Sequence, residues 1–219
     1  MSRRTIAIAA ALSVLALGSP LIAVSAKPFA IEYFNSGIDT FEEGDYQGAI
    51  ANYINALEND LKDPLAYLDR ASVKYELGDY QGAIADCSMA ISINPILSRA
   101  YHNRGAAKQE LNLHKSAIND FDKAIELEKD NAILYHYYNN RAWSKYNVGN
   151  LKMGLIDADK SIELNQEYMN SFDTRGRIKQ DLGDMKGACS DFKKSVSLGN
   201  QITAQYLNSE KGLWCRYIQ

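Results

Sequence analysis

Apolar residues in this chain fall into a succession of helix-forming stretches rather than into alternating, strand-like runs. The stretches are rich in Ala, Leu, Ile, Glu and Lys, and short Gly-Asp breaks separate them. Only four prolines interrupt the 219 residues, which favours continuous helices between the breaks. With 46% hydrophobic residues the chain can bury a core, so the pattern predicts an all-α fold that forms one folding unit.

The charge distribution argues against a nucleic-acid partner. The formal net charge is −3, and Lys and Arg do not gather into the basic face that phosphate neutralisation requires. Metal chemistry has no support, because the three cysteines form no CxxC motif and the three histidines show no ligand spacing. We therefore expect no metal, no cofactor and no small-molecule substrate.

Residues 1–26 have the layout of a secretory signal. Arg3 and Arg4 precede an uncharged, apolar stretch that ends in small residues at 24–26, and Pro20 fits the helix break before a cleavage site. Removal of both arginines leaves 22 basic and 27 acidic residues, a net charge of −5. We expect a cleaved, exported protein, with periplasm, thylakoid lumen and secretion all left open.

Two alternatives remain for this N-terminal segment. The 22 uncharged residues 5–26 are just long enough to cross a bilayer as an uncleaved anchor, and only then would the protein contact a membrane. Residues 2–6 also resemble a twin-arginine export signal, which serves cargo that folds before export.

A seven-residue sequence returns 34 residues after its first occurrence. Gly44–Ile50 recurs unchanged as Gly78–Ile84, and related residues fill the same positions at 112–118, 149–155 and 183–189. A period of 34 residues with this signature resembles the tetratricopeptide repeat (TPR) family. The resemblance implies a right-handed α-solenoid of five helical hairpins.

The repeat positions also set the expected boundaries. Their spacings are 34, 34, 37 and 34, so three extra residues enter at 132–134. Residues 203–219 carry enough apolar side chains for a further helix, which we expect to cap the exposed end of the stack. The expected repeats are 30–63, 64–97, 98–131, 135–168 and 169–202.

Two columns of the repeat bring the helices of each hairpin together. In the family, a small residue in the first helix allows close approach, and a large residue in the second helix fills the gap beyond. Here the small residues are Gly37, Ala71, Gly105, Ala142 and Gly176. The large ones are Tyr53, Cys87, Phe121 and Phe192, with Ala158 as a weak copy.

Arginine and aspartate recur together, 16 residues apart, in four repeats. The first repeat has Ser36 and Asn52 instead, so both charges are lost together. An ion pair between the two helices of a hairpin explains this, and a lysine four residues after each arginine adds a second cation beside the carboxylate. The alternative is an arginine ladder for an acidic ligand, but ligand contacts usually differ between repeats. The expected structural pairs are Arg70–Asp86, Arg104–Asp120, Arg141–Asp157 and Arg175–Asp191.

The resemblance implies that the first helices line a concave groove for a segment of a partner protein. Asn35, Asn103 and Asn140 occupy equivalent positions and suit recognition of an extended backbone, unless they bond only within the array. Trp143 is the expected anchor, unless it is buried beside the insertion. The candidate groove residues are Phe34, Asn35, Tyr75, His102, Asn103, Asn139, Asn140, Trp143, Tyr146 and Arg177.

The cysteines suggest a staple at the C-terminal end. Cys87 lies in the large, buried column and is expected to behave as a small hydrophobe. Cys189 and Cys215 fall on elements that should pack together, so they are a candidate disulfide in an oxidising compartment, or else two thiols at a helix interface.

The expected function is protein binding rather than catalysis. No phosphate loop, metal motif or nucleophile elbow is present, so we expect an exported interaction scaffold or assembly factor that holds a peptide segment or helix. The family's lysine clamp for a terminal carboxylate is missing, because Phe34, Leu68 and His102 stand in its positions. A membrane-tethered structural spacer is the alternative.

Overall fold

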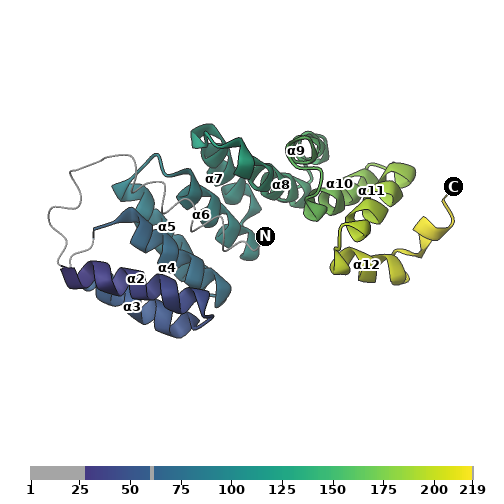
Figure 1. The fold of residues 1–219 in the computed structure, drawn as a ribbon. Helices are drawn as coiled ribbons and strands as arrows, with labels where there is room; N and C mark the ends of the chain where they lie inside the picture. Colours follow the sequence, from purple (N-terminus) through teal and green to yellow (C-terminus); the bar gives the residue numbers. More distant parts are fainter. Residues whose placement is uncertain (1–27, 60–61, 219) are drawn as a thin grey trace. The chain divides into compact units, whose positions relative to one another are not determined.

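The computed structural model describes residues 28–59 and 62–218, so the predicted export segment 1–26 lies outside the described residues. Within this part of the chain every regular element is a helix, which confirms the predicted all-α class (Figure 1). The helices are α2 (Pro28–Glu42), α3 (Tyr46–Glu58), α4 (Pro64–Glu76), α5 (Tyr80–Ile93), α6 (Ser98–Glu110), α7 (His114–Leu127), α8 (Asn131–Asn147), α9 (Leu151–Leu164), α10 (Met169–Asp181), α11 (Met185–Ser197) and α12 (Gln201–Asn208), followed by the 3-10 helix η1 (Leu213–Arg216).

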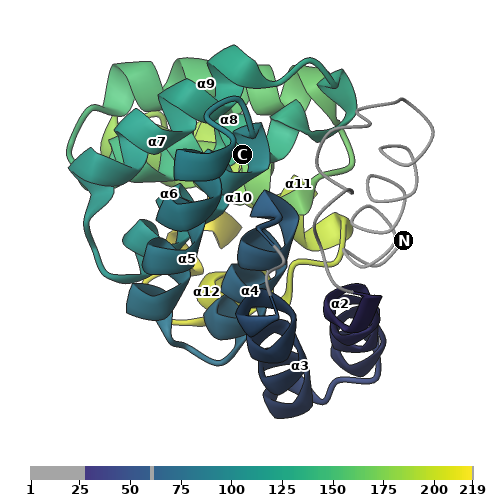
Figure 2. The same cartoon turned by 90° about the vertical axis from the view of Figure 1, so that its left-hand side faces the viewer.

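The described residues divide after Pro95 into two compact units, where the sequence had suggested a single folding unit. The division falls where a proline follows the end of α5 and breaks the helical run. In the first unit α2 packs on α3, α3 on α4 and α4 on α5 (Figure 2). In the second, α6 to α12 pack successively in chain order.

First helices of successive hairpins also contact one another within each unit. Helix α2 contacts α4 in the first unit, and α6 contacts α8, which contacts α10, in the second. Side chains in equivalent positions of these helices are therefore neighbours in space, as a shared binding face requires.

Each hairpin turns through a residue in the left-handed region. Four glycines supply it, with φ of +85° at Gly44, +79° at Gly78, +79° at Gly149 and +84° at Gly183. The third hairpin uses Asn112 at φ +59°, which is a conformation that asparagine tolerates better than most residues with a side chain.

The second helices of three hairpins begin with an aspartate cap that depends on a glycine. The carboxylates of Asp45, Asp79 and Asp184 each accept a hydrogen bond of 2.9 Å from the backbone N–H three residues later. That later residue is always glycine, because a Cβ there would collide with the capping carboxylate. The other two hairpins have neither the aspartate nor the glycine, and their second helices lack a side-chain cap bond.

Packing between paired helices explains which small residue each hairpin uses. Gly37, Gly105 and Gly176 each lie under an aromatic ring of the second helix, and a Cβ would stand 2.7 Å from a ring carbon. The rings are those of Tyr53, Phe121 and Phe192. Where the second helix carries Cys87 or Ala158 instead, the first helix carries alanine. Glycine therefore accompanies a large partner and alanine a small one, which keeps the volume between the helices nearly constant.

The three inserted residues lengthen a helix. Helix α8 has 17 residues, whereas α4, α6 and α10 have 13 each. At the C-terminal end, the predicted capping helix is shorter than expected, because α12 ends at Asn208 and the chain continues into η1. The cap is thus a short helix followed by a separate 3-10 turn.

Candidate functional site

The predicted arginine–aspartate pairs form three-residue networks in four hairpins. Asp86 illustrates them: its Oδ1 and Oδ2 accept from Arg70 Nη2 at 2.7 Å and Nε at 2.8 Å, and Lys74 Nζ lies 2.8 Å from Oδ2. The corresponding sets repeat this geometry. They are Arg104, Lys108 and Asp120; Arg141, Lys145 and Asp157; and Arg175, Lys179 and Asp191.

These networks are largely buried. The aspartate side chains are only 4% to 7% exposed, so each carboxylate has lost most of its water and depends on its two cations. Hydrogen bonding to Asp86 raises the pKa of Arg70. Removing one member of such a buried network typically costs about 3–5 kcal/mol, which makes the networks part of the scaffold.

Sequence reasoning missed two further contacts of the arginines. Each guanidinium lies 5.4 to 5.6 Å from the centroid of an aromatic ring three residues earlier, namely Tyr67, Tyr101, Tyr138 or Phe172. Arg141 Nη1 also lies 2.7 Å from Asp122 Oδ1, and Arg175 Nη1 lies 2.8 Å from Asp159 Oδ1. Because these aspartates belong to the preceding hairpin, the two arginines also connect neighbouring repeats.

The candidate groove residues of the first unit pack against aromatic partners. The Phe34 ring lies 5.8 Å from Tyr53, and the Tyr75 ring lies 5.3 Å from Tyr80. Asn35 is exposed on α2. The candidate groove residues of the first unit are therefore mainly aromatic.

The candidate residues of the second unit form what we call the first-helix face. It is defined by His102 and Asn103 on α6, Asn139, Asn140, Trp143 and Tyr146 on α8, and Arg177 on α10. Its members lie on successive first helices that contact one another.

His102 is the centre of the first part of this face. Its Nδ1 lies 3.3 Å from Asn103 Oδ1, and its Nε2 lies 3.0 Å from Asn140 Nδ2. The imidazole also stacks on Tyr137 with centroids 4.3 Å apart. Asn103 and Asn140 thus both contact His102, and their recognition of a partner's backbone stays a prediction.

Trp143 is half-buried, between the exposed anchor and the core residue that the sequence allowed. Its ring centroid lies 5.4 Å from that of Tyr146 and 5.9 Å from the Arg177 guanidinium. Burial opposes the charged form of Arg177, but hydrogen bonds to Asp173, with Nε at 2.7 Å from Oδ2, outweigh it and raise the pKa. The result is a cluster of two aromatic rings and one cation on adjacent helices.

The C-terminal cap extends this cluster. The Arg177 guanidinium also faces the ring of Tyr206 on α12, at 5.4 Å from its centroid. Tyr206 donates to Gln180 Oε1 at 2.9 Å, and Thr203 donates to Asp173 Oδ1 at 2.6 Å. The position of the first-helix side chains on α10 therefore depends on α12.

Two further observations concern Gln109, which contacts the face, and Asn139, which belongs to it. Gln109, which sequence reasoning missed, donates from Nε2 to Asn140 O at 2.7 Å and to Ser144 Oγ at 2.8 Å. Its position equals that of Tyr75 and Tyr146, so the repeat register could have identified it. Asn139 is 6% exposed, and its Oδ1 has no hydrogen-bond partner among the described residues.

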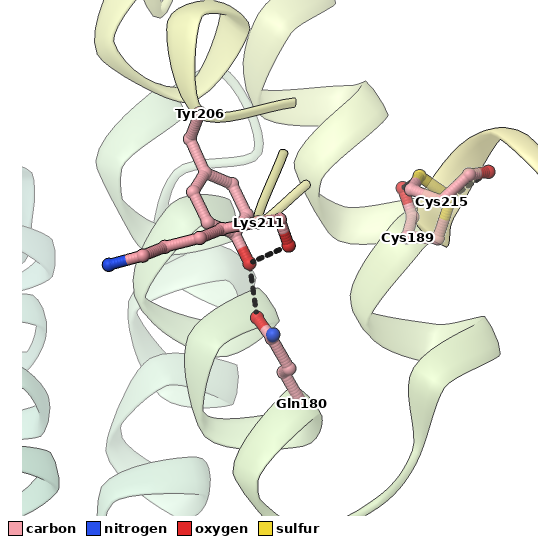
Figure 3. The surroundings of a disulfide bond; sticks show 5 residues. All are labelled: Gln180, Cys189, Tyr206, Lys211 and Cys215. Atoms are coloured by element: carbon pink, nitrogen blue, oxygen red, sulfur yellow. Dashed lines mark hydrogen bonds between the residues drawn. A yellow bond between two sulfur atoms is a disulfide. The ribbon is translucent and has the colours of Figure 1, made fainter. Parts of the chain in front are cut away.

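The structure joins Cys189 of α11 to Cys215 of η1 in a disulfide, with the Cα atoms 5.3 Å apart (Figure 3). Both cysteines are nearly inaccessible to solvent. The bond holds η1 against the last hairpin, where the sequence placed a candidate staple. Cys87 is buried on α5.

No group of three or more His, Cys, Asp or Glu side chains in residues 28–59 and 62–218 is arranged to hold a metal ion. Over the same ranges, no helix has the length and apolar character needed to span a bilayer.

Comparisons with known proteins agree with this geometry. A tetratricopeptide repeat family model matches residues 98–131, which contain α6 and α7. No curated protein sequence matches the chain.

Solved structures share the fold at low identity. MamA (residues 41 to the end) from Desulfovibrio magneticus RS-1 is 18% identical, with a TM-score of 0.72 over 81% of this chain and 98% of that chain. PilW, described as a type IV pilus biogenesis factor, is 22% identical, with a TM-score of 0.71 over 88% and 92%. YrrB, described as a TPR protein with an unusual peptide-binding site, is 19% identical, with a TM-score of 0.66 over 84% and 99%. Residues 98–131 therefore match the tetratricopeptide repeat family, and the chain shares its helical-repeat fold with solved structures that include a tetratricopeptide repeat protein.

Proposed function

We propose that this protein is an exported interaction scaffold, and that its first-helix face holds an extended segment of a partner protein. The observation that carries the proposal is the cluster of Trp143, Tyr146 and Arg177 on α8 and α10. Aromatic rings and arginine are the side chains that most often dominate binding energy at protein interfaces.

The arginines on the first helices of the second unit have different partners, and this difference supports the choice of site. Arg104, Arg141 and Arg175 bind buried aspartates of the second helices and are committed to the scaffold. Arg177 instead pairs with Asp173 on its own helix and lies beside Trp143. Removal of Arg177 would therefore alter the first-helix face without breaking the ion-pair network of a hairpin.

Similar folds add support of a general kind. The solved YrrB structure is described as having a peptide-binding site, and PilW as a biogenesis factor. For this chain we propose a binding role of the same type, in the assembly of a larger protein complex, rather than a catalytic one.

The binding proposal can be tested with a defined probe. Peptides selected from a random display library against the purified protein would be labelled and measured by fluorescence anisotropy. We expect Trp143→Ala to weaken their binding at least about tenfold, the size of a typical hot-spot loss. The matched control is Ile156→Ala, which removes an exposed apolar side chain, 57% accessible, from α9. Equal losses in both variants, or loss only in the control, would contradict the site.

Export needs a separate measurement. The intact mass and N-terminal sequence of the protein from its native host would show whether residues 1–26 are removed. Cleavage near residue 26 supports the exported scaffold, whereas a full-length, membrane-bound chain supports the tethered spacer.

A further inference from the structure

The disulfide between α11 and η1 borders a hollow on the protein surface. The hollow has a volume of about 190 Å³ and is lined by Lys193, Leu207, Asn208, Cys215 and Arg216. Of the two bonded cysteines, Cys215 is the one that lines it. Lys193, Asn208 and Arg216 are exposed, so the hollow is open to solvent, and Cys215, itself only 3% exposed, lies in its wall.

The hollow is suited to an attacking thiolate. Disulfides are opened by thiolates rather than by neutral thiols, and nearby cations raise the local concentration and the stability of an anion. Lys193 and Arg216 place two such cations beside Cys215. The chemistry of the lining therefore favours a thiol reagent that approaches in its ionised form.

Apart from the disulfide, the segment 209–218 is held at its start by α12, where Ser209 donates to Tyr206 O at 2.7 Å and Gly212 packs on Tyr206 and Leu207, and by fewer contacts further along. The Trp214 ring meets Phe192 edge-on at 6.3 Å, and Arg216 donates to Asn208 in an exposed hydrogen bond of 2.9 Å. Tyr206 O–H lies 3.4 Å from the carbonyl oxygen of Lys211 (Figure 3). The indole N–H of Trp214 is buried with no hydrogen-bond partner among the described residues, which is an unfavourable arrangement.

We infer that Cys189–Cys215 is a dithiol-exchange site whose reduction releases the C-terminal segment 209–218 and loosens α12. The thiolate of a dithiol reductant attacks Cys215 Sγ, forms a mixed disulfide with it and expels Cys189 as a thiolate, which takes up a proton. The second thiol of the reductant then attacks the mixed disulfide and expels the Cys215 thiolate, which is also protonated. Two electrons pass to the protein, and the reductant leaves as its own disulfide.

Loosening of α12 reaches the first-helix face through Tyr206. This residue contacts Arg177 with its ring and Gln180 with its hydroxyl, and it precedes the stapled segment by only a few residues. Reduction therefore weakens the support of Arg177 and, beyond it, of Trp143. This last step rests on the proposed function, whereas the exchange itself does not.

The exchange is tested with dithiothreitol as the probe on the full mature chain. A Cys87→Ala background leaves only the two bonded cysteines to titrate, and alkylation followed by intact mass counts the thiols under native conditions. We expect Lys193→Gln and Arg216→Gln together to slow the second-order rate about three- to tenfold, as loss of electrostatic steering does. Lys152→Gln on α9 is the matched control and should leave the rate unchanged.

The release of the cap is read by hydrogen exchange and fluorescence. Reduced protein, and separately Cys189→Ala/Cys215→Ala, should exchange amides of 201–218 at least about tenfold faster while peptides from 98–168 keep their protection. In a Trp214→Phe background, acrylamide should quench Trp143 more strongly after reduction. In a Trp143→Phe background the same test reports Trp214.

The outcomes separate the two proposals. Thiols that appear only at the rate of global unfolding would refute the exchange site. Unchanged protection of 201–218 after reduction would refute the release. Neither readout uses a binding partner, so both can succeed even if the selected peptides fail to bind the first-helix face.

Discussion

The first two hairpins, α2/α3 and α4/α5, have identical turns but different interiors. Both turns carry the sequence of Gly44–Ile50, with a left-handed glycine at φ +85° or +79° and an aspartate cap of 2.9 Å. Between the paired helices, however, the second hairpin has the charged network of Arg70, Lys74 and Asp86. The pair shows that the turn does not dictate how its two helices are held together.

The first hairpin fills the same three positions with neutral residues. Ser36, Thr40 and Asn52 stand where the arginine, lysine and aspartate stand in the second hairpin. Thr40 donates to Ser36 O at 2.8 Å, and Asn52 Nδ2 donates to Thr40 Oγ1 at 3.4 Å. All three charges are replaced together, as expected where a lone buried charge would be costly.

The largest expected effect comes from breaking the charged set at one member. Asp86→Asn leaves the cations of Arg70 and Lys74 close together without their carboxylate, so we expect a loss of about 3–5 kcal/mol in the stability of α4/α5. Replacing the whole set, by Arg70→Ser, Lys74→Thr and Asp86→Asn, should cost less than this single change because no charge is left unpaired. Hydrogen exchange of α4 and α5 amides measures both variants, and a triple variant less stable than Asp86→Asn would contradict the interpretation.

The second expected effect concerns the volume between the helices. Gly37 lies under the ring of Tyr53, so Gly37→Ala forces a methyl group against it and should destabilise α2/α3 by about 1–3 kcal/mol. The double variant Gly37→Ala/Tyr53→Cys recreates the alanine–cysteine pair of the second hairpin. It relieves the clash but loses the buried ring, so chemical denaturation should show clear non-additivity between the two changes. Simple additivity would show that the two positions are not in contact.

The contact between Gly37 and Tyr53 also shows how much of the fold the sequence could predict. The 34-residue period was enough for the helices, their order and the arginine–aspartate partners, because each repeat serves as a comparison for the others. The same repeat columns also show that a glycine in the first helix accompanies an aromatic residue in the second, and that an alanine accompanies a small one. This correspondence becomes interpretable only when the Cβ-to-ring distances are known.

Other features depend on contacts that the period does not encode. The contact of Arg177 with Tyr206 joins a repeat to the cap, which lies outside the period. The division after Pro95 likewise depends on packing throughout each unit. Cys189, by contrast, can be recognised in the sequence as unusual, because other repeats have Ile50, Ile84 and Ile118 in the same position.

The third expected effect uses pH to distinguish the hairpins. Burial, assisted by the carboxylates of Asp69, Asp39 and Glu42, raises the pKa of Tyr53 well above its usual value of 10.0. The folded protein buries the Tyr53 phenol in its neutral form. The contribution of this phenol to the free energy of unfolding is therefore complete below pH 10. It is lost above pH 10, where the phenol ionises in the unfolded chain. Above pH 10 the free energy of unfolding should fall by about 1.4 kcal/mol per pH unit, and this dependence should disappear in Tyr53→Phe. Urea denaturation of both proteins at pH 9 and pH 11 isolates the difference, and equal slopes would contradict it.

The smallest expected effects test whether the two turns are energetically the same. Asp45→Ala and Asp79→Ala each remove a cap of identical sequence and geometry, and each should cost about 1 kcal/mol. Because both aspartates are exposed and their caps are local, the two values should agree within a few tenths of a kcal/mol despite the different interiors. Denaturation of the two single variants and of the double variant measures the loss in the free energy of unfolding. The loss in the double variant should equal the sum of the two single losses. A marked difference between the two single losses would mean that the helix interior alters the cap, and that turn and interior cannot be treated as separate parts of the repeat.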